Sequence, residues 1–310
     1  MPRTTPLADP TLAPPAPAHL ALTPRVLLAA LRPRQWTKNL LVFIGLIFAL
    51  RLAYPDLVAR ATLACIAFCV LSSAGYLVND VADAAADRLH PVKRLRPVAS
   101  GALSAPAALA LAALLALGGM ALAFSLGTGF AAVALLYAAV TLAYSLGLKH
   151  VVLIDVFVIS AGFVLRAAAG AVAIAVPISP WLYVCTGLAA LFIALSKRRA
   201  ELVLLSDSAP GHRRNLEHYT EELLDQLIVV VLAVTVMAYT LYTFTADNLP
   251  PSHAMMLTVP VVLYGLFRYL FLVRVAGRGG SPEDLLLRDR PLLATGFCWV
   301  VLSVAILYLG

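Results

Sequence analysis

Three aspartates with a regular spacing stand out in the segment NDVADAAADRLHPVKRLRP, residues 79–97. Asp80, Asp83 and Asp87 are three and four positions apart, so a continuous helix would place them on one face. Three like charges on one face repel one another unless a cation lies among them. Magnesium suits this set, because it takes oxygen ligands, keeps part of its water shell and often shares its coordination between carboxylates and substrate phosphates. We therefore predict that the three aspartates hold Mg²⁺, with the amide of Asn79 beside them.

Basic residues follow the aspartates within a few positions. Lys93 and Arg96, together with His90 and Arg94, offer donors for phosphate oxygens that a metal leaves uncovered. The acids and bases together predict a site for a metal-bound diphosphate, in which the three aspartates, Lys93 and Arg96 have the catalytic role. The alternative is a helix end with solubilising acids, followed by a basic loop that anchors the chain at the membrane surface.

The elements that must position these residues are apolar helices. Hydrophobic residues make up 62% of the 310 residues and charged residues 13%, and the mean hydropathy is +0.91, which is too apolar for a soluble globule. Apolar runs long enough to cross a hydrocarbon core of about 30 Å predict an all-α bundle of about nine transmembrane helices. The predicted spans are 38–54, 58–78, 106–125, 129–147, 151–173, 180–196, 224–245, 255–274 and 291–309.

The distribution of Lys and Arg orients this bundle. With the N-terminus in the cytoplasm, most basic residues near span ends fall on the cytoplasmic side, and Arg51 and Arg60 fall on the other side. The net charge of +7 is therefore interpreted as a positive-inside bias, and no nucleic-acid partner is expected. This topology predicts a multi-pass protein of the plasma (inner) membrane, with the aspartate segment at the cytoplasmic end of the second span.

The chain divides into a short tail and one membrane domain. Residues 1–24 are rich in Pro, Ala and Thr, which is typical of a disordered cytoplasmic tail. Residues 25–310 are predicted to form a single transmembrane catalytic domain. The four cysteines lie in predicted spans, where a small apolar residue needs no metal or disulfide role.

The aspartate segment resembles the first aspartate motif of the UbiA superfamily of intramembrane prenyltransferases. The shared pattern is N-D-x-x-D-x-x-x-D followed by H-P-x-K-x-x-R-P and Gly101, and the resemblance runs from Arg32 to about Leu293. It implies a UbiA-like bundle of nine helices for the membrane domain. Other segments resemble one branch in particular, the decaprenyl-phosphate phosphoribosyltransferases: LRPRQWTKNLLVF (31–43), YSLGLKHVVLIDV (144–156), GFVLRAAAG (162–170), ALSKRRAEL (194–202) and GGSPEDLLLRDRPLL (279–293).

The segment SKRRAEL departs from the superfamily pattern. Ordinary members carry a second motif, D-x-x-x-D, near the loop after the sixth helix, whereas this chain has Lys197, Arg198, Arg199 and the single acid Glu201. Three cations in place of a carboxylate pair favour a bare anion, such as a lipid phosphate, over a metal. The alternative is that this basic triplet only anchors the sixth helix at the membrane surface.

Four further residues are assigned to substrate binding. Lys38, at the cytoplasmic end of the first span, could reach a phosphate or simply anchor the helix. Tyr144 and Lys149 flank the loop between the fourth and fifth spans and resemble a tyrosine and lysine pair of the family. Asp155 lies inside the fifth span, where ionisable groups are costly, and we expect it to orient a cation or a ribose hydroxyl. Arg166 would be about 16 Å farther along the same helix, too far to pair with Asp155, and is expected to be structural.

The resemblance and the residues together predict the transfer of 5-phosphoribose from phosphoribosyl pyrophosphate to a polyprenyl (decaprenyl) phosphate. Diphosphate leaves the anomeric carbon through an oxocarbenium-like transition state, whose developing charge Mg²⁺ would neutralise. The lipid phosphate is already ionised near neutral pH, with a second pKa of about 6, so no protein base is required. By resemblance, the product would enter arabinan synthesis for the cell wall.

Two other functions remain open. A UbiA-type prenyltransferase would move a prenyl group from its diphosphate to an aromatic or other acceptor, and the missing second aspartate pair counts against it. A transporter would distribute charge along several helices at membrane depth, whereas here the charge clusters at one end. The expected partners are phosphoribosyl pyrophosphate, a polyprenyl phosphate and the membrane, and the chain is compatible with a homo-oligomer.

Overall fold

The structure is a bundle of long helices. The computed structural model describes residues 23–90, 92–206, 218–247, 249–275, 285 and 287–309, and these ranges contain helices and no strand. Residues 1–22, nearly all of the predicted tail, lie outside the described residues. The predicted all-α class is confirmed.

In chain order, the helices of the described ranges are α1 (Pro24–Leu31), the 3₁₀ helix η1 (Pro33–Phe43), α2 (Ile44–Phe48), α3 (Pro55–Ala82), α4 (Ala84–Leu89), η2 (Lys93–Leu95), α5 (Ala105–Leu126), α6 (Thr128–Leu146), η3 (Leu148–His150), α7 (Ile154–Ala173), α8 (Pro180–Ser206), α9 (Glu221–Thr245), η5 (Ala254–Thr258), α10 (Val259–Arg274) and α12 (Arg290–Leu309). Eight segments of these ranges are long and apolar enough to cross a membrane: α3, α5, α6, α7, α8, α9, η5 with α10, and α12. They correspond to eight of the nine predicted spans.

Local sequence signals explain where several of these helices begin and end. Ser104 caps α5 by accepting a hydrogen bond from the backbone N–H of Ala107, and Thr220 caps α9 by accepting one from Leu223. Gly127 separates α5 from α6 with a φ of 124°, a conformation that glycine adopts without steric cost. The chain can therefore reverse direction between these two helices within one residue.

The first predicted span, 38–54, is not one continuous α-helix. The chain instead forms the 11-residue 3₁₀ helix η1 and the five-residue helix α2, although 3₁₀ runs longer than a few residues are uncommon. Close packing against α7 accompanies this path: a Cβ atom at Gly170 would lie 1.9 Å from the carbonyl oxygen of Val42. The guanidinium of Arg166 on α7 also donates a hydrogen bond to the side chain of Asn39, at 2.8 Å. This segment therefore packs closely against α7, and Asn39 also contacts Ser72 of α3.

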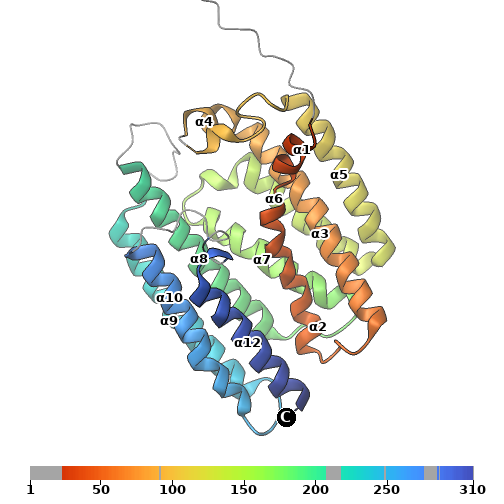
Figure 1. Cartoon of the computed structure of the whole chain (residues 1–310), viewed down its shortest axis with the longest axis vertical. Coiled ribbons are helices and arrows are strands. Elements are labelled where there is room, and N and C mark those ends of the chain that lie inside the picture. The colour runs from red at the N-terminus through yellow and green to blue at the C-terminus, as the bar shows by residue number, and fades with distance from the viewer. Residues whose placement is uncertain are drawn as a thin grey trace, which may run out of the picture.

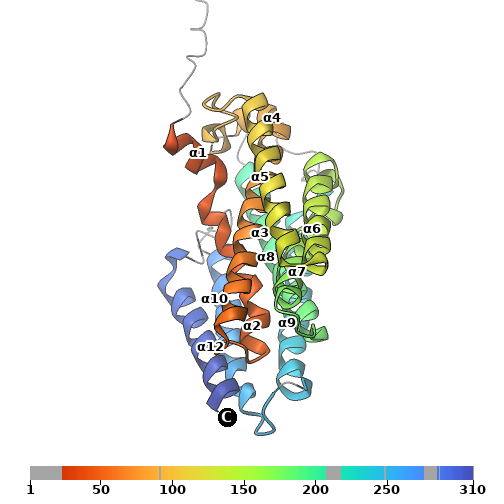
Figure 2. The same ribbon diagram turned by 90° about the vertical axis from the view of Figure 1, so that its right-hand side faces the viewer.

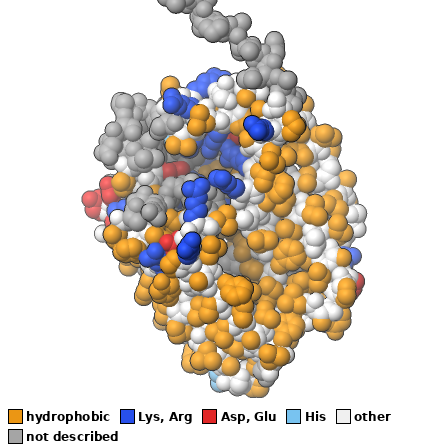
Figure 3. Space-filling model, viewed as in Figure 1, with side chains coloured by type: hydrophobic (Ala, Val, Ile, Leu, Met, Phe, Trp, Pro, Cys, Tyr) orange, Lys and Arg blue, Asp and Glu red, His pale blue; other side chains and the backbone are white. Residues whose placement is uncertain are grey.

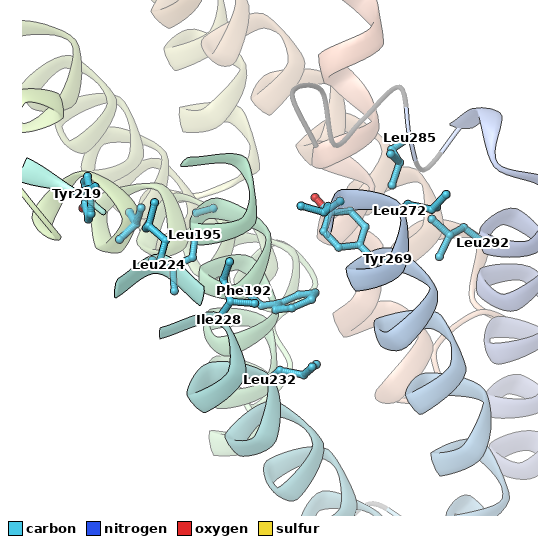
Figure 4. Close-up of a cluster of buried hydrophobic side chains, with 13 residues drawn as sticks. Phe192, Leu195, Tyr219, Leu224, Ile228, Leu232, Tyr269, Leu272, Leu285 and Leu292 are labelled. Carbon is cyan, nitrogen blue, oxygen red and sulfur yellow. The ribbon is translucent and has the colours of Figure 1, made fainter. Parts of the chain in front are cut away.

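Two groups of helices contain most of the buried apolar residues. In the first group, α3, α5, α6 and α7 pack around Phe68 and Phe130. In the second group, α8 and α9 pack around Phe192 and Ile228, and α10 contributes Tyr269. Figure 4 shows the second cluster, with side chains from α8 and α9 on one side and those from α10 and the start of α12 on the other. The helices of each group are thus held by their own buried cluster.

Helices α1 and α4 lie at one end of the bundle. Figure 1 shows α1 and α4 at one end of the long axis and the C-terminus at the other, and the view in Figure 2 agrees. We call the end with α1 and α4 the polar end. The aspartate segment of residues 79–97 lies there, because α3 runs toward this end and α5 starts from it.

Candidate active site

A cavity of about 2110 Å³ extends between the two groups of helices. Figure 3 shows Lys and Arg side chains around a hollow in the upper half of one face, and hydrophobic side chains over the lower half. Near the polar end, the lining contains the basic residues Arg25, Arg32, Arg34, Lys38, Lys93, Arg96, Lys197 and Arg198. Farther in, the lining is mainly apolar and aromatic, with Phe48, Trp181, Tyr239, Tyr242 and Trp299. Such a cavity suits an amphipathic ligand with an anionic head and an apolar chain.

The three aspartates do not lie on one uninterrupted helix. Helix α3 ends at Ala82 and α4 begins at Ala84, with Asp83 at the junction in a bridge-region conformation (φ −94°, ψ 0°). Asp80 and Asp87 are buried, with 1% and 4% of their surfaces exposed, whereas Asp83 is partly exposed. The structure therefore interrupts the predicted continuous helix at the middle aspartate.

Each aspartate has a basic partner. Asp87 accepts a hydrogen bond from Arg96 at 2.6 Å, and the same guanidinium nitrogen lies 3.3 Å from Asp80. Asp80 also forms an ion pair with Arg32 through the same carboxylate oxygen, Oδ1. Asp83 pairs separately, with the buried Lys149 at 2.6 Å. Among the described residues, no group of three or more His, Cys, Asp and Glu side chains is arranged to hold a metal ion.

Two oxygen atoms of this segment nevertheless fit a metal. The Oδ1 atom of Asn79 and the Oδ2 atom of Asp80 are buried and accept no hydrogen bond from the residues that the structure describes. A buried oxygen without a partner is costly unless a ligand supplies one. Mg²⁺ commonly binds through one or two protein groups and completes its coordination with phosphate oxygens and water. Asn79 and Asp80 therefore fit a metal shared with a substrate, and the ligand roles of Asp83 and Asp87 stay predictions.

The loop after α4 carries basic residues into the cavity lining. The Nδ1 atom of His90 accepts hydrogen bonds from the backbone N–H groups of Val92 at 3.1 Å and Lys93 at 3.2 Å. This contact fixes the turn that leads into η2. As a result Lys93 and Arg96, which the sequence analysis assigned to the phosphate site, both line the cavity.

A buried polar cluster surrounds Arg198 on the opposite wall of the cavity. Arg198 is 2% exposed, and it donates hydrogen bonds to Asp155 at 2.6 Å and to the hydroxyl of Tyr144 at 3.1 Å. It also forms an ion pair with Glu201. Tyr144, Arg198 and Glu201 line the cavity. Asp155, which is fully buried, acts on this wall through its contact with Arg198.

The basic triplet of α8 is divided between two surfaces. Lys197 and Arg198 line the cavity, whereas Arg199 is not among its lining residues. Arg199 instead lies 2.6 Å from Asp225 and 3.3 Å from Glu221, both on α9. Consecutive residues of a helix point about 100° apart, so three in a row cannot face one cavity. The structure therefore places Arg199 outside the site to which the sequence analysis assigned it.

Comparison with known proteins identifies the family. Residues 39–278 match the UbiA prenyltransferase family. The chain belongs to this family. It is 35% identical to the decaprenyl-phosphate phosphoribosyltransferase of Mycolicibacterium smegmatis, with 91% of this chain and 92% of the relative covered, and 34% identical to that of Corynebacterium glutamicum, with 91% and 87% covered.

The fold of this UbiA family member also matches solved structures. A UbiA homolog from Archaeoglobus fulgidus bound to GPP and Mg²⁺ superposes with a TM-score of 0.71 at 18% identity, covering 91% of this chain and 99% of that chain. The predicted UbiA-like bundle is thus confirmed. The family assignment agrees with the resemblance found in the aspartate segment.

Several residues of the UbiA site have roles that the sequence analysis did not assign. Arg32 contacts Asp80, and its guanidinium also lies 5.2 Å from the ring centre of Tyr76. Tyr219 donates a hydrogen bond to Asp155 at 3.0 Å, although 64 positions separate the two residues. The sequence pattern predicted no contact for Arg32, which is one of several basic residues near the first predicted span. Tyr219 gave no signal, because its partner is distant in the chain.

Two other basic residues hold the first segment of the chain. Lys38 lines the cavity and donates a hydrogen bond to Gln35 at 2.5 Å. Arg166, expected to be structural, donates hydrogen bonds to Asn39, to the hydroxyl of Tyr137 at 2.7 Å and to the carbonyl of Gly162 at 2.8 Å. It thereby joins η1 to α6 and α7, and it also lines the cavity.

Proposed function

We propose that this UbiA family member transfers 5-phosphoribose from phosphoribosyl pyrophosphate to a polyprenyl phosphate, with release of diphosphate. The observation that carries the proposal is a cavity with two basic walls and an apolar interior. Arg32 and Arg96 lie on the wall beside Asp80, and Lys197 and Arg198 lie on the other. Two anionic substrates require two cationic surfaces, whereas a prenyl diphosphate with a neutral acceptor requires one. The likeness to relatives named decaprenyl-phosphate phosphoribosyltransferase supports the same reaction.

The residues of the first wall would bind the donor. Asn79 and Asp80 would hold Mg²⁺, and Arg96 and Lys93 would donate hydrogen bonds to phosphate oxygens. When bound, Mg²⁺ would neutralise the negative charge that develops on the departing diphosphate. Arg96 would also stabilise this negative charge, because its ion pair with Asp87, at 2.6 Å, holds the guanidinium in place.

The residues of the second wall would bind the acceptor. Lys197 and Arg198 would hold the lipid phosphate, and the contacts of Arg198 with Asp155 and Tyr144 would fix its guanidinium. A phosphate oxygen attacks the anomeric carbon of ribose, the bond from that carbon to the diphosphate oxygen breaks, and the electron pair leaves with the diphosphate. The phosphate is already ionised, so the wall contributes orientation and charge rather than a base.

The assay that tests this proposal follows labelled phosphoribose into lipid. Purified protein in detergent is incubated with Mg²⁺, decaprenyl phosphate and labelled phosphoribosyl pyrophosphate, and the organic phase is counted. We expect transfer that EDTA and Asp80→Asn abolish and that Arg88→Gln preserves, because Arg88 contacts the carbonyl of Ala99 and not the aspartates. Turnover of a prenyl diphosphate with an aromatic acceptor by folded protein, without phosphoribose transfer, would overturn the proposal in favour of a prenyltransferase.

We also propose that the polar end faces the cytoplasm, in the plasma membrane. Basic residues line the cavity at this end, as the positive-inside rule requires of a cytoplasmic surface. In a variant without cysteines, Leu95→Cys would mark the polar end and Asp56→Cys the opposite end, since both positions are exposed. An impermeant thiol reagent applied to intact spheroplasts should label only Asp56→Cys, and the reverse pattern would contradict the orientation.

A further inference from the structure

Arg32 lies between Asp80 and the cavity. Arg32 and Arg96 both line the cavity, whereas none of the three aspartates is among its lining residues within the described part of the chain. The carboxylate of Asp80 is 1% exposed, and both guanidinium groups contact its Oδ1 atom. A cation that enters from the cavity therefore meets two arginines before it reaches Asp80.

The backbone of Arg32 is held in an unfavourable conformation. Its φ of 53° and ψ of 60° lie in the left-handed region, which residues with a Cβ atom adopt rarely. Arg32 is also the single residue between α1 and η1, so a change in its dihedral angles would alter the angle between these two helices. The ion pair with Asp80 and the contact with the ring of Tyr76 oppose such a change. A residue strained in this way is held by its partners and can move when they are lost.

The charges around Asp80 disfavour a metal that arrives alone. A dication bound to the carboxylate would lie beside two guanidinium groups and be repelled by both. A diphosphate reverses this balance, because its oxygens can accept the hydrogen bonds of the arginines while they coordinate the metal. The metal and the diphosphate would therefore each strengthen the binding of the other.

We propose that Arg32 is an exchangeable counter-ion. In the free protein it neutralises Asp80 and keeps the affinity for a divalent metal low. When a metal and a diphosphate bind, its guanidinium transfers from the carboxylate to the diphosphate. The inference rests on the proposed function only in requiring a diphosphate-bearing donor, and it holds equally for phosphoribosyl pyrophosphate and for a prenyl diphosphate.

Direct binding of Mn²⁺, without turnover, tests this exchange. The full chain in detergent is titrated with Mn²⁺, and free Mn²⁺ is followed by electron paramagnetic resonance. We expect weak binding to the unaltered protein and binding about tenfold tighter to Arg32→Gln, because one repelling charge is removed. In a second measurement at saturating Mn²⁺, Arg32→Gln should retain labelled inorganic pyrophosphate about tenfold less tightly, since a charge-assisted contact is lost.

Two further variants make the test specific. Arg88→Gln removes the same charge from the neighbouring helix, where Arg88 contacts the carbonyl of Ala99, and should change both affinities by less than about twofold. Arg32→Lys keeps the positive charge and should bind Mn²⁺ nearly as weakly as the unaltered protein. The proposal is overturned if Arg32→Gln, folded by its thermal melt, binds Mn²⁺ no more tightly than the unaltered protein, or if Arg88→Gln reproduces its effect. Neither result depends on whether phosphoribose is transferred, so the two proposals fail separately.

Discussion

The hydroxyl of Tyr219 donates a hydrogen bond to the carboxylate of Asp155, at 3.0 Å, and joins the start of α9 to the start of α7. The same hydroxyl accepts the backbone N–H of Leu153 at 2.7 Å, where the chain has a φ of 64°. Asp155 in turn holds Arg198 at 2.6 Å. A tyrosine that is not among the cavity-lining residues in the described ranges therefore fixes the position of a guanidinium that lines the cavity.

Removing the hydroxyl of Tyr219 should loosen the second wall of the cavity. Tyr219→Phe leaves the N–H of Leu153 and one oxygen of Asp155 without this partner, which should cost about 1 to 2 kcal/mol of stability. The KM for the polyprenyl phosphate should rise several-fold, and the KM for the diphosphate donor should change little. Thermal unfolding and initial rates measure the two effects.

Tyr242→Phe is the matched control for stability. The hydroxyl of Tyr242 is buried and has no hydrogen-bond partner among the described residues. Its removal should leave the free energy of unfolding unchanged or slightly increased. Equal melting temperatures for the two variants would show that the contacts of Tyr219 contribute no stability.

The same tyrosine should affect stability in alkaline solution. Burial, with the nearby carboxylate of Asp155, raises the pKa of Tyr219 to about 12, above the value of about 10 of an unfolded tyrosine. A group whose pKa is raised in the folded state contributes stability below pH 10 and loses it as the pH rises toward 12. Melting temperatures should therefore fall more steeply from pH 10 to 11 in the unaltered protein than in Tyr219→Phe. If the melting temperatures of the two proteins fall in parallel with pH, the raised pKa of Tyr219 is contradicted.

Lys197 and Arg199 should differ in function, although they are two positions apart on α8. Lys197→Ala should raise the KM for the polyprenyl phosphate, because Lys197 lines the cavity. Arg199→Ala should keep the rate within about twofold of that of the unaltered protein. It should lower the free energy of unfolding by at most about 1 kcal/mol, since partly exposed ion pairs contribute little to stability. The two variants lose the same charge, so an equal rise in KM would show that α8 acts through its overall charge alone.

Gly170 should be the least replaceable glycine of the helix packing. In Gly170→Ala the new methyl group would meet the backbone of Val42 at 1.9 Å, so η1 must move away from α7, at a cost of about 3 kcal/mol or more. Gly118→Ala, in α5, meets no atom within 4 Å and should be neutral or stabilising by up to about 1 kcal/mol. The melting temperatures of both variants are measured in the same detergent. Equal melting temperatures would contradict the close contact between Gly170 and Val42.

The sequence alone determined the helical class, eight of the spans and the segment that carries the acids. Apolar length is a local property, so it could be read directly from runs such as residues 106–125, which correspond to α5. The aspartate segment could be identified equally well as a candidate site, because its charged residues lie in a chain that is otherwise mostly apolar. The position of Asp155 in a helical span, where an ionisable group is costly, was also visible in the sequence.

Only the tertiary structure decided which partner each charge takes. Asp80 contacts Arg32 across 48 positions, Asp83 contacts Lys149 across 66, and Arg199 turns from the cavity to Asp225. The break at Asp83 and the 3₁₀ course of η1 likewise became visible only in the structure. Ion pairs and close backbone contacts depend on the distances between helices. The spacing of residues along one helix does not predict those distances.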